Sequence, residues 1–185
     1  MSTTPKGRKN ANLHIEQKDV EFVQLLWNLF NAIGIVGAKP HTRCRMDKRT
    51  NNTYTSTQFA TFTHSFFTEM FQLWYLNVDG KNIKIVPANL ADLFTSVSLA
   101  YWVSSDVTFR KDSGTVVLCT DSFSADEVDF LRSLLLEKFN IQSTRVSNGM
   151  SKNQYRISIA KASVPTIQNI VYPHMPSTMT FRVGL

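Results

Sequence analysis

Apolar residues recur with helical spacing in two separate segments of this chain. In residues 19–33 and 125–139 the apolar side chains return every three or four positions, which predicts an amphipathic helix in each segment. The apolar faces are formed by Val20, Val23, Leu26, Trp27 and Phe30 in the first helix, and by Val128, Leu131, Leu134, Leu135 and Phe139 in the second. A short strand-like run precedes each helix, at residues 13–15 and 115–119.

The two helices belong to a longer internal match. Positions 20–23 and 128–131 carry similar residues, an offset of 108. Each helix is followed by an alternating run that predicts a half-buried strand, at residues 57–62 and 155–159, and then by a second apolar helix, at residues 64–75 and 163–172. The pattern predicts a duplication of strand, helix, strand and helix in an α/β (α+β) fold.

A further apolar helix is predicted before the second repeat. It runs from Leu99 to Asp106, so that its last residue is acidic. The offset of 108 places the counterpart of Asp106 upstream of Met1, so we expect the first repeat to lack this helix. The repeats are predicted at residues 1–94 and 95–185, together forming one compact unit.

Composition agrees with an ordered globular protein. Of 185 residues, 43% are apolar, and no run approaches the roughly eighteen apolar residues of a membrane span. The polar, basic start has no apolar run, so we expect no secretory signal, and it is short for a transit peptide. The sequence contains no glycine-rich phosphate loop, nucleophile elbow or HExxH helix.

The positive charge is distributed unevenly. The net charge is +6, and residues 1–50 hold nine Lys/Arg against four Asp/Glu, whereas the remaining 135 residues hold eleven against ten. A basic surplus in one segment is typical of proteins that bind a phosphate backbone, although a solvated basic surface without a ligand is the alternative.

The cysteines and histidines give little evidence for a metal site. Cys44 and Cys119 are the only cysteines, and His41-x-x-Cys44 has the spacing of half a zinc site. Free, mostly buried thiols in a reducing compartment are the preferred interpretation.

Several segments, taken together, resemble a known family. They are residues 10–17, 59–65, 80–90, 99–102, 118–123 and 172–179. In this order they make nearly the whole chain similar to LAGLIDADG homing endonucleases of the mitochondrial, intron-encoded type. The resemblance implies two pseudo-repeats, each an antiparallel β-saddle backed by helices and lying along a nucleic-acid groove, here with the first motif helix missing. It also implies a mitochondrial location.

The resemblance assigns the family's catalytic carboxylate to Asp106, which would also bind Mg²⁺. Val107 stands where the family has glycine, and Ser105 where this type often has a second aspartate. One carboxylate cannot form the family's metal site alone. We therefore expect a degenerate site without a cofactor, or an Mg²⁺ site if the protein is active.

Basic residues of both repeats are the predicted nucleic-acid contacts. They are Arg8, Lys9, Arg43, Arg45, Lys48, Arg49, Arg110, Lys111, Arg145, Lys152 and Arg156. Arg43 and Arg45 would point the same way from a strand, and Lys48 and Arg49 would follow in a turn. Arg145 and Arg156 lie in strand-like stretches, and Arg110, Lys111 and Lys152 in loops.

The helix before the second repeat is also a predicted interface. Without its counterpart, we expect a half-covered apolar stripe that packs on a second copy of the chain or on another protein. The stripe consists of Leu99, Ala100, Trp102, Val103 and Val107.

Three functions remain open at this point. We favour a nucleic-acid-binding protein that has lost cutting and binds structured RNA, such as an intron or ribosomal RNA. This overlaps with a structural subunit of a ribonucleoprotein. The alternative is an active double-strand DNA endonuclease, completed by dimerisation or by a chain that supplies the missing helix.

Overall fold

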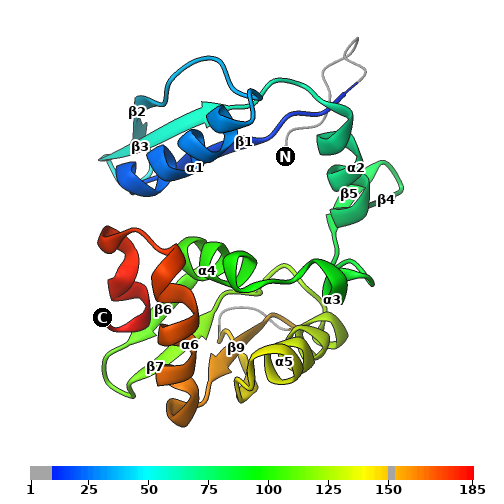
Figure 1. The fold of residues 1–185 in the computed structure, drawn as a ribbon, viewed down its shortest axis with the longest axis vertical. Helices are drawn as coiled ribbons and strands as arrows, with labels where there is room; N and C mark the ends of the chain where they lie inside the picture. The colour runs from blue at the N-terminus through cyan, green and yellow to red at the C-terminus, as the bar shows by residue number, and fades with distance from the viewer. Residues whose placement is uncertain (1–9, 150–152) are drawn as a thin grey trace. The chain divides into compact units, whose positions relative to one another are not determined.

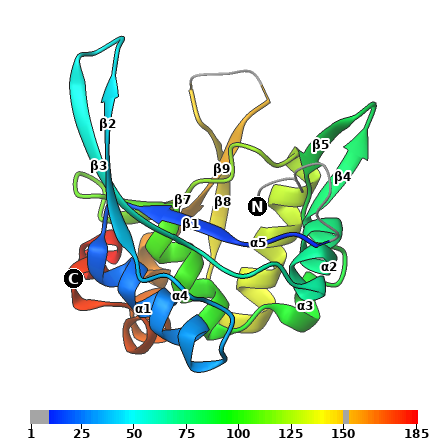
Figure 2. The same cartoon turned by 90° about the horizontal axis from the view of Figure 1, so that it is seen from above.

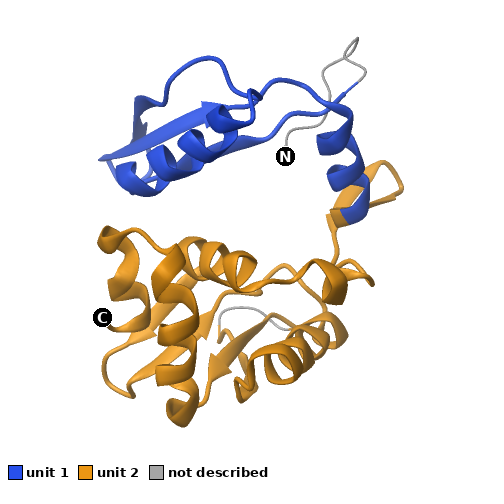
Figure 3. Ribbon diagram, in the orientation of Figure 1, with its two compact units in different colours: residues 1–73 blue, residues 74–185 orange. Residues whose placement is uncertain are grey.

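The chain folds into two compact units, at residues 1–73 and 74–185 (Figure 3). The structure is a computed structural model and describes residues 10–149 and 153–185. The fold is mixed α/β with antiparallel sheets, as the sequence predicts. Each unit is described by itself below.

The first unit is a three-stranded antiparallel sheet with a helix on one face (Figure 1). Its elements are β1 (His14–Gln17), α1 (Val20–Ala32), β2 (His41–Asp47), β3 (Asn52–Ala60) and α2 (Ser65–Trp74), and the strand order is β1-β3-β2. The Asp19 side chain caps α1 by accepting from the Phe22 N–H at 2.7 Å. Val23, Val36 and Phe59 form the core between α1 and the sheet.

Strands β2 and β3 continue beyond this core as a long hairpin (Figure 2). Every residue of β2 is exposed except Asp47, which is half-buried, whereas Thr57 and Phe59 near the end of β3 are buried. The far half of the hairpin therefore presents both of its faces to solvent.

The second unit contains a four-stranded antiparallel sheet in the order β6-β7-β9-β8 and a separate two-stranded hairpin. Its strands are β4 (Tyr75–Val78), β5 (Lys81–Lys84), β6 (Val107–Arg110), β7 (Thr115–Leu118), β8 (Ser143–Ser147) and β9 (Tyr155–Ile159). Its helices are α3 (Leu90–Leu93), α4 (Ser96–Ser105), α5 (Ala125–Phe139), η1 (Lys161–Ser163), α6 (Val164–Val171), η2 (Tyr172–His174) and η3 (Ser177–Val183). None of the described helices is long and apolar enough to cross a membrane.

The predicted element order is present in both halves. The series β1, α1, β3, α2 matches β7, α5, β9, α6, and in each half an additional strand, β2 or β8, pairs with the last strand of the series. Helix α4 and strand β6 have no counterpart among the described residues that precede β1. The division into compact units falls after Leu73, whereas the division between repeats was placed after residue 94.

The expectation of an exposed stripe on α4 is wrong. Leu99, Ala100 and Val103 are fully buried, and Val107 is 4% exposed. They belong to the core of the second unit, where α4 contacts α6, η2 and η3, and half-buried Trp102 packs edge-on against Phe94. The C-terminal helices cover the surface that was assigned to a partner.

Candidate nucleic-acid interface

One face of the sheet in the first unit is almost entirely polar. Strand pairing places alternate residues of β1, β3 and β2 on the side opposite α1, because paired residues of antiparallel strands face the same way. We call this surface the β1–β3–β2 face. Its polar members are His14, Glu16, His41, Arg43, Arg45, Asp47, Asn52, Tyr54, Ser56 and Gln58.

Arg43 and Arg45 lie on β2, an edge strand of this face. They pair with Ser56 and Tyr54 of β3 and are exposed, which confirms that the two arginines point the same way. Among the described residues, neither guanidinium has a carboxylate within ion-pair distance. Two unneutralised, exposed guanidinium groups on a strand are suited to phosphate oxygens.

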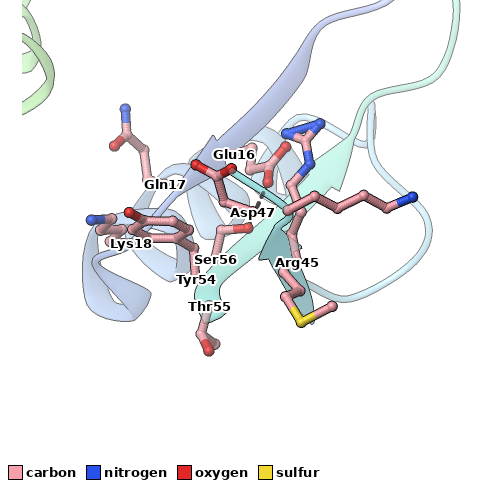
Figure 4. Close-up of a pocket in the computed structure, with 10 residues that line it drawn as sticks. Glu16, Gln17, Lys18, Arg45, Asp47, Tyr54, Thr55 and Ser56 are labelled. Atoms are coloured by element: carbon pink, nitrogen blue, oxygen red, sulfur yellow. Dashed lines mark hydrogen bonds between the residues drawn. The ribbon is translucent and has the colours of Figure 1, made fainter. Parts of the chain in front are cut away.

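Hydrogen bonds across the strands hold the other polar groups of the face. The Ser56 hydroxyl donates to Glu16 Oε1 at 2.5 Å, and Gln58 Nε2 lies 2.9 Å from His41 Nε2 (Figure 4 shows the first pair). The Ser56 hydrogen bond lowers the pKa of Glu16, burial opposes this, and the charges of Arg43, His14 and Arg45 lower the pKa further. The Glu16 side chain is therefore ionised at neutral pH.

An aromatic ring stands beside these charges. Tyr54 is 41% exposed, and Lys18 Nζ lies 5.3 Å from its ring centroid. Both residues line a shallow pocket with Glu16, Arg45 and Ser56 (Figure 4). Exposed aromatic rings next to cations are a common means of stacking unpaired bases.

The turn between β2 and β3 carries Lys48 and Arg49, as predicted. The Arg49 side chain is 85% exposed, and its guanidinium lies 3.9 Å from Asp47, which also accepts the Arg49 N–H at 2.8 Å. The turn thus keeps both cations at the exposed tip of the hairpin. The predicted contacts Arg8, Lys9 and Lys152 lie outside the described residues.

Two of the predicted arginines of the second unit, Arg145 and Arg156, are already engaged with carboxylates. Arg156 makes a bidentate pair with Asp121, with Nη2 2.7 Å and Nε 2.9 Å from the carboxylate oxygens. This interaction lowers the pKa of Asp121 and raises that of Arg156. Arg156 lies on the sheet face opposite the helices, since it pairs with Val146 rather than with a core position.

Arg145 occupies the other face. It pairs with the core residue Ile157, and its guanidinium bonds to Asp129 and to the Ala125 carbonyl of α5. It also lies over the Tyr155 ring. Arg145 therefore faces the helices rather than the surface on which nucleic-acid contacts were expected.

Arg110 and Lys111 are both exposed, but only Lys111 lies in a loop. Arg110 is the last residue of β6, which corrects its assignment to a loop. Lys111 begins the turn to β7.

Asp106 caps the C-terminal end of α4 and is exposed. Its N–H donates to the Trp102 carbonyl at 3.0 Å, and its own carbonyl accepts from the Cys119 N–H at 2.8 Å. Arg182 Nη1 donates to the next carbonyl, that of Val107, at 2.8 Å. Within residues 10–149 and 153–185, no three His, Cys, Asp or Glu side chains are grouped as a metal site requires.

The cysteines do not form the suggested half-site. His41 and Cys44 are three positions apart on β2, so their side chains leave opposite faces of the strand. Cys44 is exposed, contrary to the expectation of a buried thiol, and Cys119 is half-buried. Burial raises the pKa of the Cys119 thiol.

Sequence reasoning found the arginines of the β1–β3–β2 face but missed their neighbours. The missed residues are His14, Glu16, Lys18, His41, Tyr54, Ser56 and Gln58. The strand predicted at residues 57–62 covers only the end of β3, but the same alternation, followed back to residue 52, places Tyr54, Ser56 and Gln58 on the face opposite Thr57 and Phe59. That alternation alone does not predict which residues of β1 and β2 pair with which residues of β3.

Known proteins resemble this chain over nearly its whole length. The family model of the LAGLIDADG DNA endonuclease family matches residues 2–167. Cytochrome b mRNA maturase bI2 of Saccharomyces cerevisiae is 28% identical over 184 residues, which are 97% of this chain and 43% of that protein. DNA endonuclease I-ChuI of Chlamydomonas applanata is 28% identical over 145 residues, which are 75% of this chain and 66% of that protein.

The fold is also found among solved structures. The homing endonuclease I-WcaI bound to its DNA recognition sequence matches 98% of this chain and 78% of that chain, with a TM-score of 0.82 and 24% sequence identity. This likeness establishes the fold. The chain spans less than half the length of the maturase and two thirds of the length of I-ChuI.

Proposed function

The chain belongs to the LAGLIDADG DNA endonuclease family, and on that premise we propose that it binds nucleic acid through the β1–β3–β2 face. The target that we propose is structured RNA, such as an intron or ribosomal RNA, in a mitochondrion. In this proposal the protein no longer cuts and needs no metal cofactor. It acts as an RNA-binding or structural subunit of a ribonucleoprotein.

The observation that carries the proposal is the pair Arg43 and Arg45. Both are exposed on one face of a hairpin and lie beyond ion-pair distance of every described carboxylate. Cations that already have acidic partners must break those pairs before they bind phosphate. Arg43 and Arg45 do not carry that cost, so they are available to a polyanion.

Two observations favour RNA over duplex DNA. The exposed Tyr54 ring beside Lys18 provides a stacking surface, which serves splayed, unpaired bases better than the stacked interior of a duplex. A relative that aligns with 97% of this chain is named an mRNA maturase.

The end of α4 supports the proposed loss of cutting. Ser105 turns its hydroxyl back to the Tyr101 carbonyl at 2.9 Å, and Val107 is a buried strand residue paired with Leu118. Within residues 96–107, which form α4 and its end, Asp106 is then the one acidic residue. A bound metal would activate water and stabilise the leaving oxygen, and Asp106 would supply one of its ligands.

Binding to two probes tests the proposal. We expect the purified chain to bind a stem–loop RNA more tightly than a duplex DNA of equal length, with an affinity that falls steeply with salt. Replacing Arg43, Arg45, Lys48 and Arg49 together with glutamine should remove most of this binding. Unchanged RNA binding by that purified variant would place the RNA contact elsewhere on the chain, whereas a wild type that does not bind RNA would favour a subunit that contacts only protein.

An active DNA endonuclease completed by another chain is the second candidate, and the repeat comparison favours it. Strand β7 pairs with β6 on its outer side, whereas its counterpart β1 is an edge strand. Val20 of α1 is 60% exposed, whereas Val128, its equivalent in α5, is fully buried. The first repeat thus leaves open a strand edge and an apolar position that are covered in the second.

Cleavage assays distinguish the two candidates. A completed nuclease would cut duplex DNA in the presence of Mg²⁺, and Asp106→Asn would abolish cutting while leaving binding intact. We expect no cutting by either form of the chain, alone or as a dimer. Cutting by the wild type that is lost in Asp106→Asn would replace our proposal with this one.

A further inference from the structure

Two carboxylates lie on the β1–β3–β2 face, in different environments. Asp47, at the tip of the hairpin, is used by the turn, where it binds the backbone and side chain of Arg49. Glu16 projects from the edge strand β1, where the charges of Arg43 and Arg45 act on it from across β3. A negative side chain on a phosphate-binding surface needs an explanation.

Ion pairing does not explain Glu16. Among the described residues, no Lys, Arg or His nitrogen lies within 4.0 Å of its carboxylate, although Arg43, His14 and Arg45 are close enough to favour its charge. The arginines of the second unit differ, since Asp129 and Asp121 bind Arg145 and Arg156 directly. Glu16 therefore does not neutralise an individual arginine.

The Glu16 carboxylate is held in place by one strand-to-strand contact. The Ser56 hydroxyl donates to Oε1 at 2.5 Å, which fixes the side chain while leaving it exposed (Figure 4). A fixed, ionised acceptor on an open surface is arranged to receive a hydrogen bond from a ligand.

A nucleic acid offers such an acceptor few groups. Phosphate oxygens repel a carboxylate, and the ribose 2′-hydroxyl can donate to it in every nucleotide alike. The sequence-dependent donors are the N–H groups of the bases, chief among them the exocyclic amino groups of cytosine, adenine and guanine. We propose that Glu16 is a specificity-determining residue that accepts a hydrogen bond from a base amino group, while Arg43 and Arg45, across β3 on the opposite edge strand, hold the phosphate backbone. This inference rests on the proposed function, because it assigns one residue's role within that interface.

The competing explanation is that Glu16 only weakens the positive field of the face. The two explanations differ in sequence dependence. Removing a charge from a field changes the affinity for every sequence by the same factor, whereas removing a base contact changes the preference at one position.

Selection from a randomised RNA pool separates them. The full chain, Glu16→Ala, Glu16→Gln and the control Glu21→Ala would each select from stem–loop RNAs with a randomised loop, in EDTA, followed by sequencing. Glu21 is an exposed carboxylate on α1, so the control removes the same charge from the helix side of the sheet.

We expect the wild type and Glu21→Ala to prefer an amino-bearing base over uracil at one loop position, by roughly tenfold. Glu16→Ala should lose the preference at that position and keep the others, and Glu16→Gln should weaken or change it. Because glutamine can still accept the Ser56 hydrogen bond, Glu16→Gln also tests the role without loss of the strand-to-strand contact.

Three results would overturn the inference. One is a Glu16→Ala variant that binds every sequence more tightly with unchanged preferences. Another is a preference that appears only when Mg²⁺ replaces EDTA, because Glu16 would then act through a cation. The third is a wild type that does not bind the pool at all, which would also refute the proposed function, whereas the first two leave that function intact.

Discussion

Whether an arginine is available to a ligand depends here on which carboxylates the fold brings to it. Arg145 and Arg156 are bound by Asp129 and Asp121, which lie 16 and 35 residues away in the sequence. Arg43 and Arg45 have no such partner among the described residues. Charge counting treats the four alike, because the partners come together only through strand pairing and helix packing.

Tyr54 provides a test at the scale of one side chain. We expect Tyr54→Ala to weaken binding of a single-stranded loop by about 1 to 3 kcal/mol, because the variant loses the stacking surface. Binding of a fully paired duplex should change little, and Tyr54→Phe should resemble the wild type. Fluorescence anisotropy with both probes measures this, and an equal loss on the two probes would contradict a stacking role.

The pair Asp121–Arg156 predicts a pH dependence of stability. The folded-state pKa of Asp121 lies below its ordinary value of 3.8, chiefly because of the Arg156 hydrogen bond. Its contribution is therefore present above about pH 4 and is lost as the pH falls through the folded-state value. We expect Asp121→Asn to cost on the order of 1 kcal/mol at pH 7, a modest figure because the pair is partly exposed.

Urea unfolding at pH 7 and pH 3 measures the effect. The difference between wild type and Asp121→Asn should shrink at the lower pH. The control Asp112→Asn, in an exposed turn, should behave like the wild type at both values. If the difference in unfolding free energy between the two proteins grew on acidification, the pKa of Asp121 would be raised rather than lowered in the folded state.

At the scale of elements, periodicity located the helices and strands well. The predicted helices at 19–33 and 125–139 are α1 and α5, and the strand at 155–159 is β9. Each of these elements buries one of its faces, and the regular spacing of apolar residues in the sequence reflects that burial. The strand-like stretch around Arg145 is β8, but its register, which turns Arg145 toward the helices, follows from pairing with β9.

The burial of α4 depended on elements that are distant in the sequence. The apolar residues of α4 identified a packing surface, but not what covers it. The covering helices α6, η2 and η3 lie about 60 to 80 residues later in the chain. The helix itself was thus predictable, and its packing partner was not.

Glu127 links the start of α5 to a distant segment. One carboxylate oxygen accepts the Ser124 N–H in a capping box, and the other accepts the Val86 N–H, each at 2.7 Å. Burial opposes ionisation, but the hydrogen bonds from the Ser124 and Val86 backbone outweigh it and lower the pKa of Glu127. We expect Glu127→Ala to cost about 1 to 2 kcal/mol of unfolding free energy.

Chemical denaturation compares Glu127→Ala with Glu137→Ala, an exposed position on the same helix. The second variant should change stability by less than about 0.5 kcal/mol. Equal effects of the two substitutions would mean that the cap and the Val86 contact contribute nothing.

At the scale of the whole molecule, the two repeats share one order of strands and helices but differ in their additional elements and in their charge. The second repeat has the additional helix α4 and the additional strand β6 in its sheet, whereas the described part of the first unit has a counterpart of neither. The charge is also unequal, since residues 1–73 hold nine Lys/Arg and five Asp/Glu, and residues 74–185 hold eleven and nine. The sequence revealed this inequality, and the structure locates four of the first unit's cations on one hairpin.

The salt dependence of binding tests the central claim that this hairpin holds nucleic acid. The affinity for a stem–loop RNA would be measured from 50 to 300 mM salt for the wild type, for Arg43→Gln/Arg45→Gln, and for the charge-matched control Lys81→Gln/Lys161→Gln in the second unit. Losing two phosphate contacts should reduce the slope of log affinity against log salt by roughly 1.4 to 1.8. We expect that reduction in the arginine variant and an unchanged slope in the control, whereas equal slopes for all three proteins would contradict the assignment of the interface to the β1–β3–β2 face.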